Sequence, residues 1–309
     1  MKVTLMSSTF NPSPDVPPEI ENAAQSGELV VFVGAGISRL IECPSWDGFA
    51  DKVLEQLVPG GVDYHELSQI NAIRDPKKRL SIAKIIAEKK KLRIDYQSIF
   101  RVTLGPDNVY SYLNAFNSSF VTTNYEKYLC PDSRSADPED EWRFHRRDQL
   151  LRLNLDKNGN VIHLHGCLDD PDNMIITTKD YLEHYSSDEV QTFLKYLFEK
   201  KTVLFLGYGL EEIEVLEYIL RRGNVVSRFG DAPARRYILQ GFFNAEMALF
   251  ELLREYYQKS FGTELIGFPK DYQNYHHQVG ILASWSKKLK FSGVALVDEV
   301  TALEDEIRG

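Results

Sequence analysis

Cysteine is scarce in this 309-residue chain, which contains Cys43, Cys130 and Cys167 and no others. Three widely separated cysteines cannot build a disulfide framework or a four-cysteine zinc ribbon. Basic charge is also in deficit, because 36 Lys+Arg face 45 Asp+Glu and leave a formal net charge of -9. An overall field of that sign disfavours direct binding to a nucleic-acid backbone.

Long apolar runs are missing as well. Nowhere do about eighteen apolar residues follow one another, as a membrane-spanning helix requires, and residues 1–18 lack the apolar core of a signal peptide. We therefore expect a cytoplasmic protein without a membrane segment. The chain is nevertheless 43% hydrophobic, which is enough to build one large buried core.

Short apolar runs predict buried β-strands at several points of the sequence. These runs are residues 29–33, 120–123, 161–164, 174–177, 202–206, 236–239 and 264–267. Helical patterns occur between them, at about 20–24, 46–57, 109–116, 245–257 and 275–289. Such alternation is typical of a parallel sheet that helices cover on both sides.

We therefore predict an α/β fold, a Rossmann-like doubly wound parallel sheet with an inserted helical subdomain. Residues 1–27 are expected to form an N-terminal arm with a short helix, and residues 28–309 the main domain. The helical insert spans about 58–117, and a strand and helix extension spans about 232–309. The Asp-, Arg- and Pro-rich segment 131–148 is predicted to be a surface loop.

A glycine turn directly follows the first predicted strand, with Gly34, Ala35, Gly36 and Ser38 in sequence. Small residues there let the phosphates of a dinucleotide approach the backbone, and a helix start supplies amide donors. The full Gly-x-Gly-x-x-Gly pattern is absent, because Arg39 stands where the third glycine would be. The alternative interpretation is an ordinary tight turn between strand and helix.

A polar segment, residues 122–126, ends the second predicted core strand with the sequence Thr-Thr-Asn-Tyr-Glu. Ligands of doubly wound sheets bind at such strand ends. The amide of Asn124 can donate and accept hydrogen bonds to a ribose hydroxyl or a water without introducing a charge. Alternatively, Asn124 only caps a helix that follows.

Two histidines end the next core strand, where alternation would send His163 and His165 to one face and Leu164 to the other. No third metal ligand occurs at a recognisable spacing, so we predict no metal site. An unperturbed histidine pKa near about 6.5 suits a general base at neutral pH. A lone histidine is more often structural, so a catalytic role requires that several strand ends converge.

A second glycine turn follows the strand at 202–206, where Gly207 and Gly209 flank Tyr208. Glycines here would let the backbone approach the adenosine half of a dinucleotide. Taken alone, the segment is also explained as a simple turn.

In this order, Gly-Ala-Gly-Ile-Ser, Thr-Thr-Asn-Tyr-Glu, Leu-His-Gly and Phe-Leu-Gly-Tyr-Gly resemble the motif series of the sirtuin superfamily, over roughly residues 28–220. Pro-Ser-Trp at 44–46 and Thr-Thr-Lys-Asp-Tyr at 177–181 make the chain most similar to the bacterial sirtuin-like branch of anti-phage defence proteins. Protein-deacylating sirtuins differ: they carry a zinc ribbon, Thr-Gln-Asn in place of residues 122–124, and Gly-Ile-Pro-x-Phe-Arg in place of the segment near 43–46.

The resemblance implies an NAD glycohydrolase that cleaves NAD to nicotinamide and ADP-ribose, with water favoured over acyl-lysine as nucleophile. Asn124 would hold the nicotinamide ribose and the attacking water, and His165 would be the general base. No metal is implied. The NAD-binding residues implied are Gly34, Ala35, Gly36, Ser38, Trp46, Thr123, Glu126, Gly207, Tyr208, Gly209 and Glu212.

Relatives of this branch resemble effectors that deplete NAD when a phage is sensed, in abortive infection, so their activity must be gated. We expect a homo-oligomer and a separate activator, for which the family suggests a hexameric HerA-type ATPase. Val300, Leu303 and Ile307 lie at helical spacing and could form an oligomer contact, although a packed terminal helix is more common. Two alternatives stay open: an NAD-dependent deacylase or ADP-ribosyltransferase, and a non-catalytic sensor module that binds NAD or ADP-ribose.

Overall fold

A computed structural model of the chain describes residues 9–131, 144–145, 149–209, 235–271 and 274–290. In these residues the strands form one parallel sheet, as predicted, with the spatial order β3-β4-β2-β1-β5-β6-β7. The strands are β1 (Leu29–Val33), β2 (Ser119–Thr122), β3 (Phe144–His145), β4 (Val161–His163), β5 (Thr202–Leu206), β6 (Arg236–Phe242) and β7 (Thr263–Pro269).

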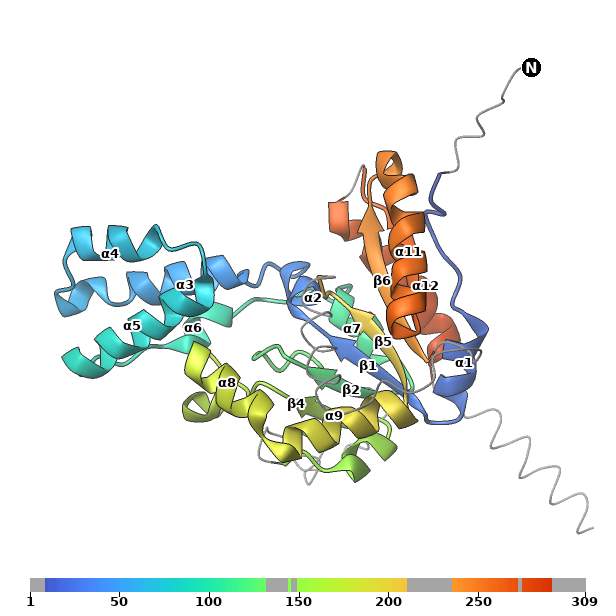
Figure 1. The fold of residues 1–309 in the computed structure, drawn as a ribbon, viewed down its shortest axis with the longest axis horizontal. Helices are drawn as coiled ribbons and strands as arrows, with labels where there is room; N and C mark the ends of the chain where they lie inside the picture. The colour runs from blue at the N-terminus through green and yellow to red at the C-terminus, as the bar shows by residue number, and fades with distance from the viewer. Residues whose placement is uncertain (1–8, 132–143, 146–148, 210–234, 272–273, 291–309) are drawn as a thin grey trace, which may run out of the picture.

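Helices cover both faces of this sheet (Figure 1). One face packs against α1 (Pro18–Gln25), α7 (Val109–Asn114) and α12 (His277–Leu289), and the other against α9 (Asp188–Lys200) and α11 (Met247–Phe261). Alternate residues of β1 serve the two layers, because Val31 and Val33 belong to the first core while Val30 and Phe32 belong to the second. Burial on both sides explains why this strand is apolar throughout.

The chain between β1 and β2 forms a group of helices that projects to one side of the sheet (Figure 1). After the short α2 (Ala35–Arg39), its members are α3 (Trp46–Glu55), α4 (Tyr64–Asn71), α5 (Pro76–Lys90) and α6 (Tyr96–Phe100). The first turns of α5 contact α8 (Thr178–Ser186), which follows β4. The predicted fold class, including the inserted helical subdomain, is therefore confirmed. Within the part of the chain that the structure describes, no helix combines the length and apolar character needed to cross a bilayer.

The strand predicted at residues 174–177 is wrong. Thr177 is instead the N-cap of α8, in a capping box with Asp180, so only three apolar residues precede a helix start. Those residues pair with the turn after β4, where the Ile175 N–H donates to the His165 carbonyl at 2.9 Å. The spacing of Thr177 and Asp180 is typical of a capping box and indicates a helix start at this point of the sequence.

The loop predicted at 131–148 is wrong at Phe144–His145, which form β3 and pair with β4 at the edge of the sheet. The rest of that segment beyond Pro131 lies outside the described residues. So does the C-terminal segment that contains Val300, Leu303 and Ile307. The remaining predicted strands and helices are confirmed, with ends that differ by a few residues.

The two glycine turns meet at the carboxyl ends of β1 and β5, next to the point where the order of strands in the sheet reverses direction. Strands β2 and β4 lie on one side of β1, whereas β5, β6 and β7 lie on the other. The Gly34 N–H donates to the Leu206 carbonyl and the Gly36 N–H to the Gly207 carbonyl, both at 2.8 Å. Gly207 has a φ of 70°, and a Cβ there would lie 2.5 Å from the backbone nitrogen of Ile37. Close packing of two backbones therefore requires glycine at this position.

We expect Gly207→Ala to destabilise the protein by about 2–4 kcal/mol, because it adds steric overlap to the cost of a left-handed alanine. Urea unfolding of the two proteins measures this loss. Gly209→Ala is the matched control, since a Cβ there meets no atom of the described chain within 4 Å, and its effect should stay within about 0.5 kcal/mol. Equal unfolding midpoints for Gly207→Ala and the wild type would contradict the packing role.

Candidate functional site

Two adjoining pockets open over the carboxyl ends of β1, β2 and β5. The first, here called the Asn124 pocket, measures about 370 Å³, and the second, the Gly207 pocket, about 520 Å³. The predicted site residues that line the first are Ala35, Ser38, Trp46, Thr123, Asn124, Glu126, His165 and Tyr208. Those that line the second are Ala35, Gly36, Trp46, Gly207, Tyr208 and Gly209. Residues far apart in the sequence thus converge at one edge of the sheet.

Asn124 is held by hydrogen bonds on both its backbone and its side chain. Its side-chain nitrogen donates to the Gly34 carbonyl at 3.1 Å and to the Ser38 hydroxyl at 2.7 Å, and its backbone N–H donates to the Thr122 hydroxyl at 3.0 Å. No helix follows in residues 125–131, so the helix-capping alternative for Asn124 is wrong. With its nitrogen committed to two partners, the side chain offers its oxygen as an acceptor.

Glu126 is a buried carboxylate in the wall of the Asn124 pocket. It accepts hydrogen bonds from the Ser38 and Tyr110 hydroxyls, each at 2.6 Å. Burial raises the pKa of Glu126 above its ordinary value, and the hydrogen bonds only partly oppose this. Tyr110, from α7, is a site residue that sequence reasoning missed, because its position in an amphipathic helix predicts only a core role.

Glu126→Gln is expected to become progressively more stable relative to the wild type as the pH rises from acid to neutral. A raised folded-state pKa gives the wild type stability that is full at low pH and is lost as the pH rises through that pKa. Glutamine imitates the protonated carboxyl and does not titrate. Denaturant unfolding at several pH values measures the free energy of unfolding of the variant minus that of the wild type. A difference that stays constant or becomes more negative as the pH rises would refute the assignment.

Glu255→Gln serves as the control for that series. Glu255 is an exposed residue of α11 that pairs with Lys259, and the ion pair lowers its pKa. The stability lost in this variant should therefore be largest at neutral pH and should disappear as the pH falls, with a small amplitude because the pair is exposed. The two glutamates are expected to give pH trends of opposite sign.

His163 and His165 have different surroundings, because β4 ends at His163 and strand alternation does not continue to residue 165. The His163 Nδ1 lies 3.0 Å from the Asn124 carbonyl oxygen, which can only accept, so Nδ1 carries the proton. Burial lowers the pKa of His163 to about 4. His163 therefore positions the Asn124 backbone as a neutral imidazole, a role that the sequence left open.

His165 lines the Asn124 pocket and is 2% exposed. Its Nε2 lies 2.8 Å from the Tyr185 hydroxyl, and its buried Nδ1 has no hydrogen-bond partner among the described residues. Burial, and then the nearby charges of His184 and Lys77, hold the pKa of His165 well below 6.5. The imidazole is thus neutral at pH 7 and able to accept a proton.

Tyr208 separates the two pockets. Its hydroxyl lies 2.6 Å from the Thr123 hydroxyl, across the end of β1, and a Cβ on Gly34 would lie 2.6 Å from its ring. Gly34 thus makes room for Tyr208 and lines neither of the two pockets. The predicted binding residue Glu212 lies outside the described residues.

Comparison with known proteins gives two matches to this chain. Residues 118–263 match the family model of the SIR2-like domain. The chain is also 24% identical over 209 residues to Defense-associated sirtuin 2 of Bacillus subtilis. That alignment covers 64% of this chain and 19% of the Bacillus protein, so the chain spans about a fifth of the length of that relative.

The matched segment of this chain contains Asn124, His165 and the second glycine turn, whereas the first glycine turn precedes that segment. The parallel sheet brings all of them to its carboxyl edge, on the neighbouring strands β4, β2, β1 and β5. Fold, motif order and family match agree, and residues 118–263 of this chain are similar to the SIR2-like domain.

Proposed function

We propose that this chain is an NAD glycohydrolase, which cleaves the bond between nicotinamide and ribose to give nicotinamide and ADP-ribose. One observation carries the proposal: the amide of Asn124 and the neutral imidazole of His165 line a single pocket that adjoins a glycine-lined one. Both pockets lie at the switch point of a parallel sheet, where dinucleotides bind. Their volumes are in the range of small-molecule sites.

In this scheme the nicotinamide half of NAD occupies the Asn124 pocket, and the adenosine half occupies the Gly207 pocket. The C1′–N bond breaks, nicotinamide leaves as a neutral molecule with the electron pair of that bond, and positive charge develops on the ribose. The Asn124 oxygen accepts a hydrogen bond from a ribose hydroxyl or the attacking water. His165 takes one proton from that water as its oxygen bonds to C1′, and later releases the proton to solvent.

We propose further that this activity serves anti-phage defence by depleting NAD in the cytoplasm. The support is the similarity to the Bacillus protein, whose name denotes a defence-associated sirtuin. An NAD-depleting enzyme must be kept inactive in a healthy cell, so we propose a homo-oligomer and control by a separate protein. A HerA-type hexameric ATPase is the activator that we would test first.

The experiment is to incubate the purified chain with NAD, alone and with the product of the neighbouring gene, and to follow nicotinamide and ADP-ribose by chromatography. Nicotinamide release without an acyl peptide supports the glycohydrolase. Release that depends on an acyl peptide or another acceptor instead supports a deacylase or ADP-ribosyltransferase. A second experiment measures the NAD content of cells that express the chain, before and after infection with phage. If the protein binds NAD but the NAD content of infected cells does not fall, the proposal is overturned in favour of a sensor module.

A further inference from the structure

Lys77 is a charged residue at the Asn124 pocket that the proposed reaction does not use. Among the described residues that line this pocket, it is the only lysine or arginine. It belongs to the first turn of α5, in the helical insert, yet its Nζ lies 3.9 Å from the ring centroid of Tyr181 in α8. The ring of Trp46, from α3, is 5.9 Å away. Lys77 therefore connects the helical insert to α8, the helix that follows β4.

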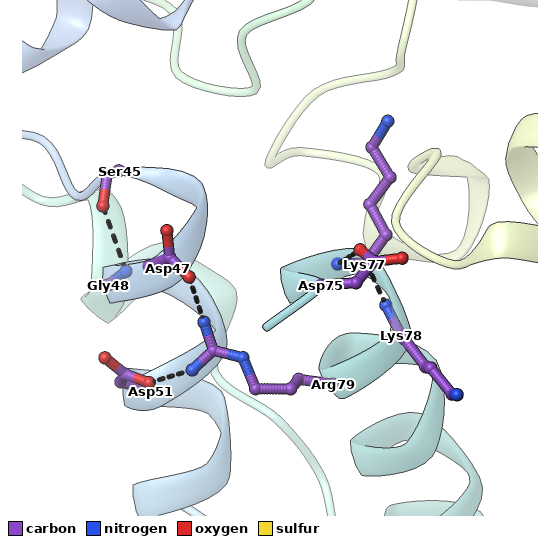
Figure 2. Close-up of polar contacts among 8 residues, drawn as sticks. All are labelled: Ser45, Asp47, Gly48, Asp51, Asp75, Lys77, Lys78 and Arg79. Atoms are coloured by element: carbon purple, nitrogen blue, oxygen red, sulfur yellow. Dashed lines mark hydrogen bonds and ion pairs between the residues drawn. The ribbon is translucent and has the colours of Figure 1, made fainter. Parts of the chain in front are cut away.

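The first turn of α5 is firmly placed. The buried guanidinium of Arg79 forms ion pairs with Asp47 and Asp51, two carboxylates of α3 (Figure 2). Asp75 caps the helix by accepting from the Lys77 N–H at 2.9 Å. Figure 2 also shows that the Lys77 and Lys78 side chains leave this turn in different directions. The position of the Lys77 ammonium thus follows from the packing of α5 on α3.

A second contact fixes α5 against α8, because the Thr178 N–H donates to the Ser81 hydroxyl at 3.0 Å. On α8, the ring of Tyr181 packs at 5.0 Å from that of His165 and nearly perpendicular to it. Lys77, Tyr181 and His165 therefore form a continuous series of contacts. It runs from the helical insert to the imidazole that we propose as the base.

Among the described residues, the rings and charges next to His165 come from α8 and α5, and the carboxyl groups that line the same pocket are those of Asp75 and Glu126. Tyr181, His184 and Tyr185 belong to α8, and all three rings lie within 6 Å of the imidazole ring. Lys77 is contributed by α5 and is the cation of the set. A positive charge near a buried imidazole opposes its protonation, in the same direction as burial.

We propose that Lys77 is a positioning residue for His165: its ammonium steadies the Tyr181 ring against the imidazole and places a positive charge in the wall of the pocket that the imidazole lines. The inference rests on the proposed function only in that it names His165 as the base. It also gives the helical insert a direct effect on the reaction, because separating α5 from α8 would remove the charge. A base controlled in this way would be sensitive to any partner that moves the insert.

The first test measures protonation of His165 by NMR titration of the full chain with labelled histidine, and does not require turnover. His165→Gln identifies the resonance. In Lys77→Met the pKa of His165 should rise, because a nearby positive charge is lost, whereas Lys77→Arg should keep the wild-type value. Lys78→Met, on the same turn but exposed, should leave it unchanged. An unchanged pKa in Lys77→Met, or an equal rise in Lys78→Met, overturns the proposal.

The second test follows the pH profile of NAD hydrolysis in the same variants. If Lys77 keeps His165 unprotonated, the acid limb of Lys77→Met moves to higher pH by the shift seen in the titration, and Lys77→Arg restores it. A rate that falls equally at every pH, without a shift, would show a merely structural role and overturn the proposal. Should the wild type show no NAD hydrolysis under any condition, the proposed function fails while the titration still decides the role of Lys77.

Discussion

Asn124→Ala should reduce NAD hydrolysis by about 10²- to 10³-fold while the protein stays folded. Removing one preorganised hydrogen-bonding group from an active site typically costs this much, because the reacting water and ribose lose their fixed geometry. The side chain accounts for two hydrogen bonds, to the Gly34 carbonyl and the Ser38 hydroxyl, so some stability is lost as well. Single-turnover rates measured with saturating NAD separate the chemical defect from weaker binding.

Asn114→Ala is the matched control for this experiment. Asn114 is partly buried whereas Asn124 is buried, but its side chain also makes two hydrogen bonds, to the Tyr128 carbonyl and from the Cys130 N–H, and it does not line the Asn124 pocket. It should lose a comparable amount of stability and keep its turnover. Wild-type rates in Asn124→Ala, or an equal loss of rate in Asn114→Ala, would contradict the assigned role.

The sequence was sufficient to predict which loops meet at the site. The run at 29–33 is apolar at every position, which only a strand buried on both faces requires, and Asn124 and His165 follow comparable runs. Parallel strands bring their carboxyl ends to one edge, so the meeting of these loops follows from strand direction alone. The prediction needed no knowledge of side-chain packing.

Side chains supplied by the helices that lie between β1 and β2 in the sequence could not be predicted in this way. Lys77 and Tyr110 belong to helices, and a helical pattern in the sequence does not show where the helix lies relative to the sheet. Their placement depends on contacts between distant segments, such as the ion pairs from Arg79 to α3. No local pattern in the sequence encodes those contacts.

The glycines illustrate a different limit of sequence reasoning. The space that a dinucleotide needs is one reason for glycine at positions 36 and 207. In the structure, the backbones of Gly36 and Gly207 also hydrogen-bond to each other, and a Cβ on Gly36 would lie 2.8 Å from Gly207. Either cause selects glycine, so residue type alone does not distinguish them. Both residues also line the Gly207 pocket, where the proposed dinucleotide would need the same space.

His165→Gln is expected to reduce NAD hydrolysis by about 10²- to 10⁴-fold, the usual contribution of a general base. In the wild type, the low pKa of His165 keeps the base form fully populated through neutral pH. The rate should therefore show no inflection near 6.5 and should fall only in more acidic solution. A rate profile recorded from neutral to acid pH measures both features.

His184→Gln separates loss of the base from loss of packing. His184 is buried beside His165, with ring centroids 5.9 Å apart, but it does not line the Asn124 pocket. Replacing His184 disturbs the same cluster of rings but leaves the proposed proton acceptor of the pocket, His165, in place. The rate should therefore stay within about tenfold of the wild type. If both variants lose activity equally, the cluster on α8 is structural and the base lies elsewhere. If only His165→Gln does, the imidazole of His165, and not the packing of the cluster, is the proton acceptor.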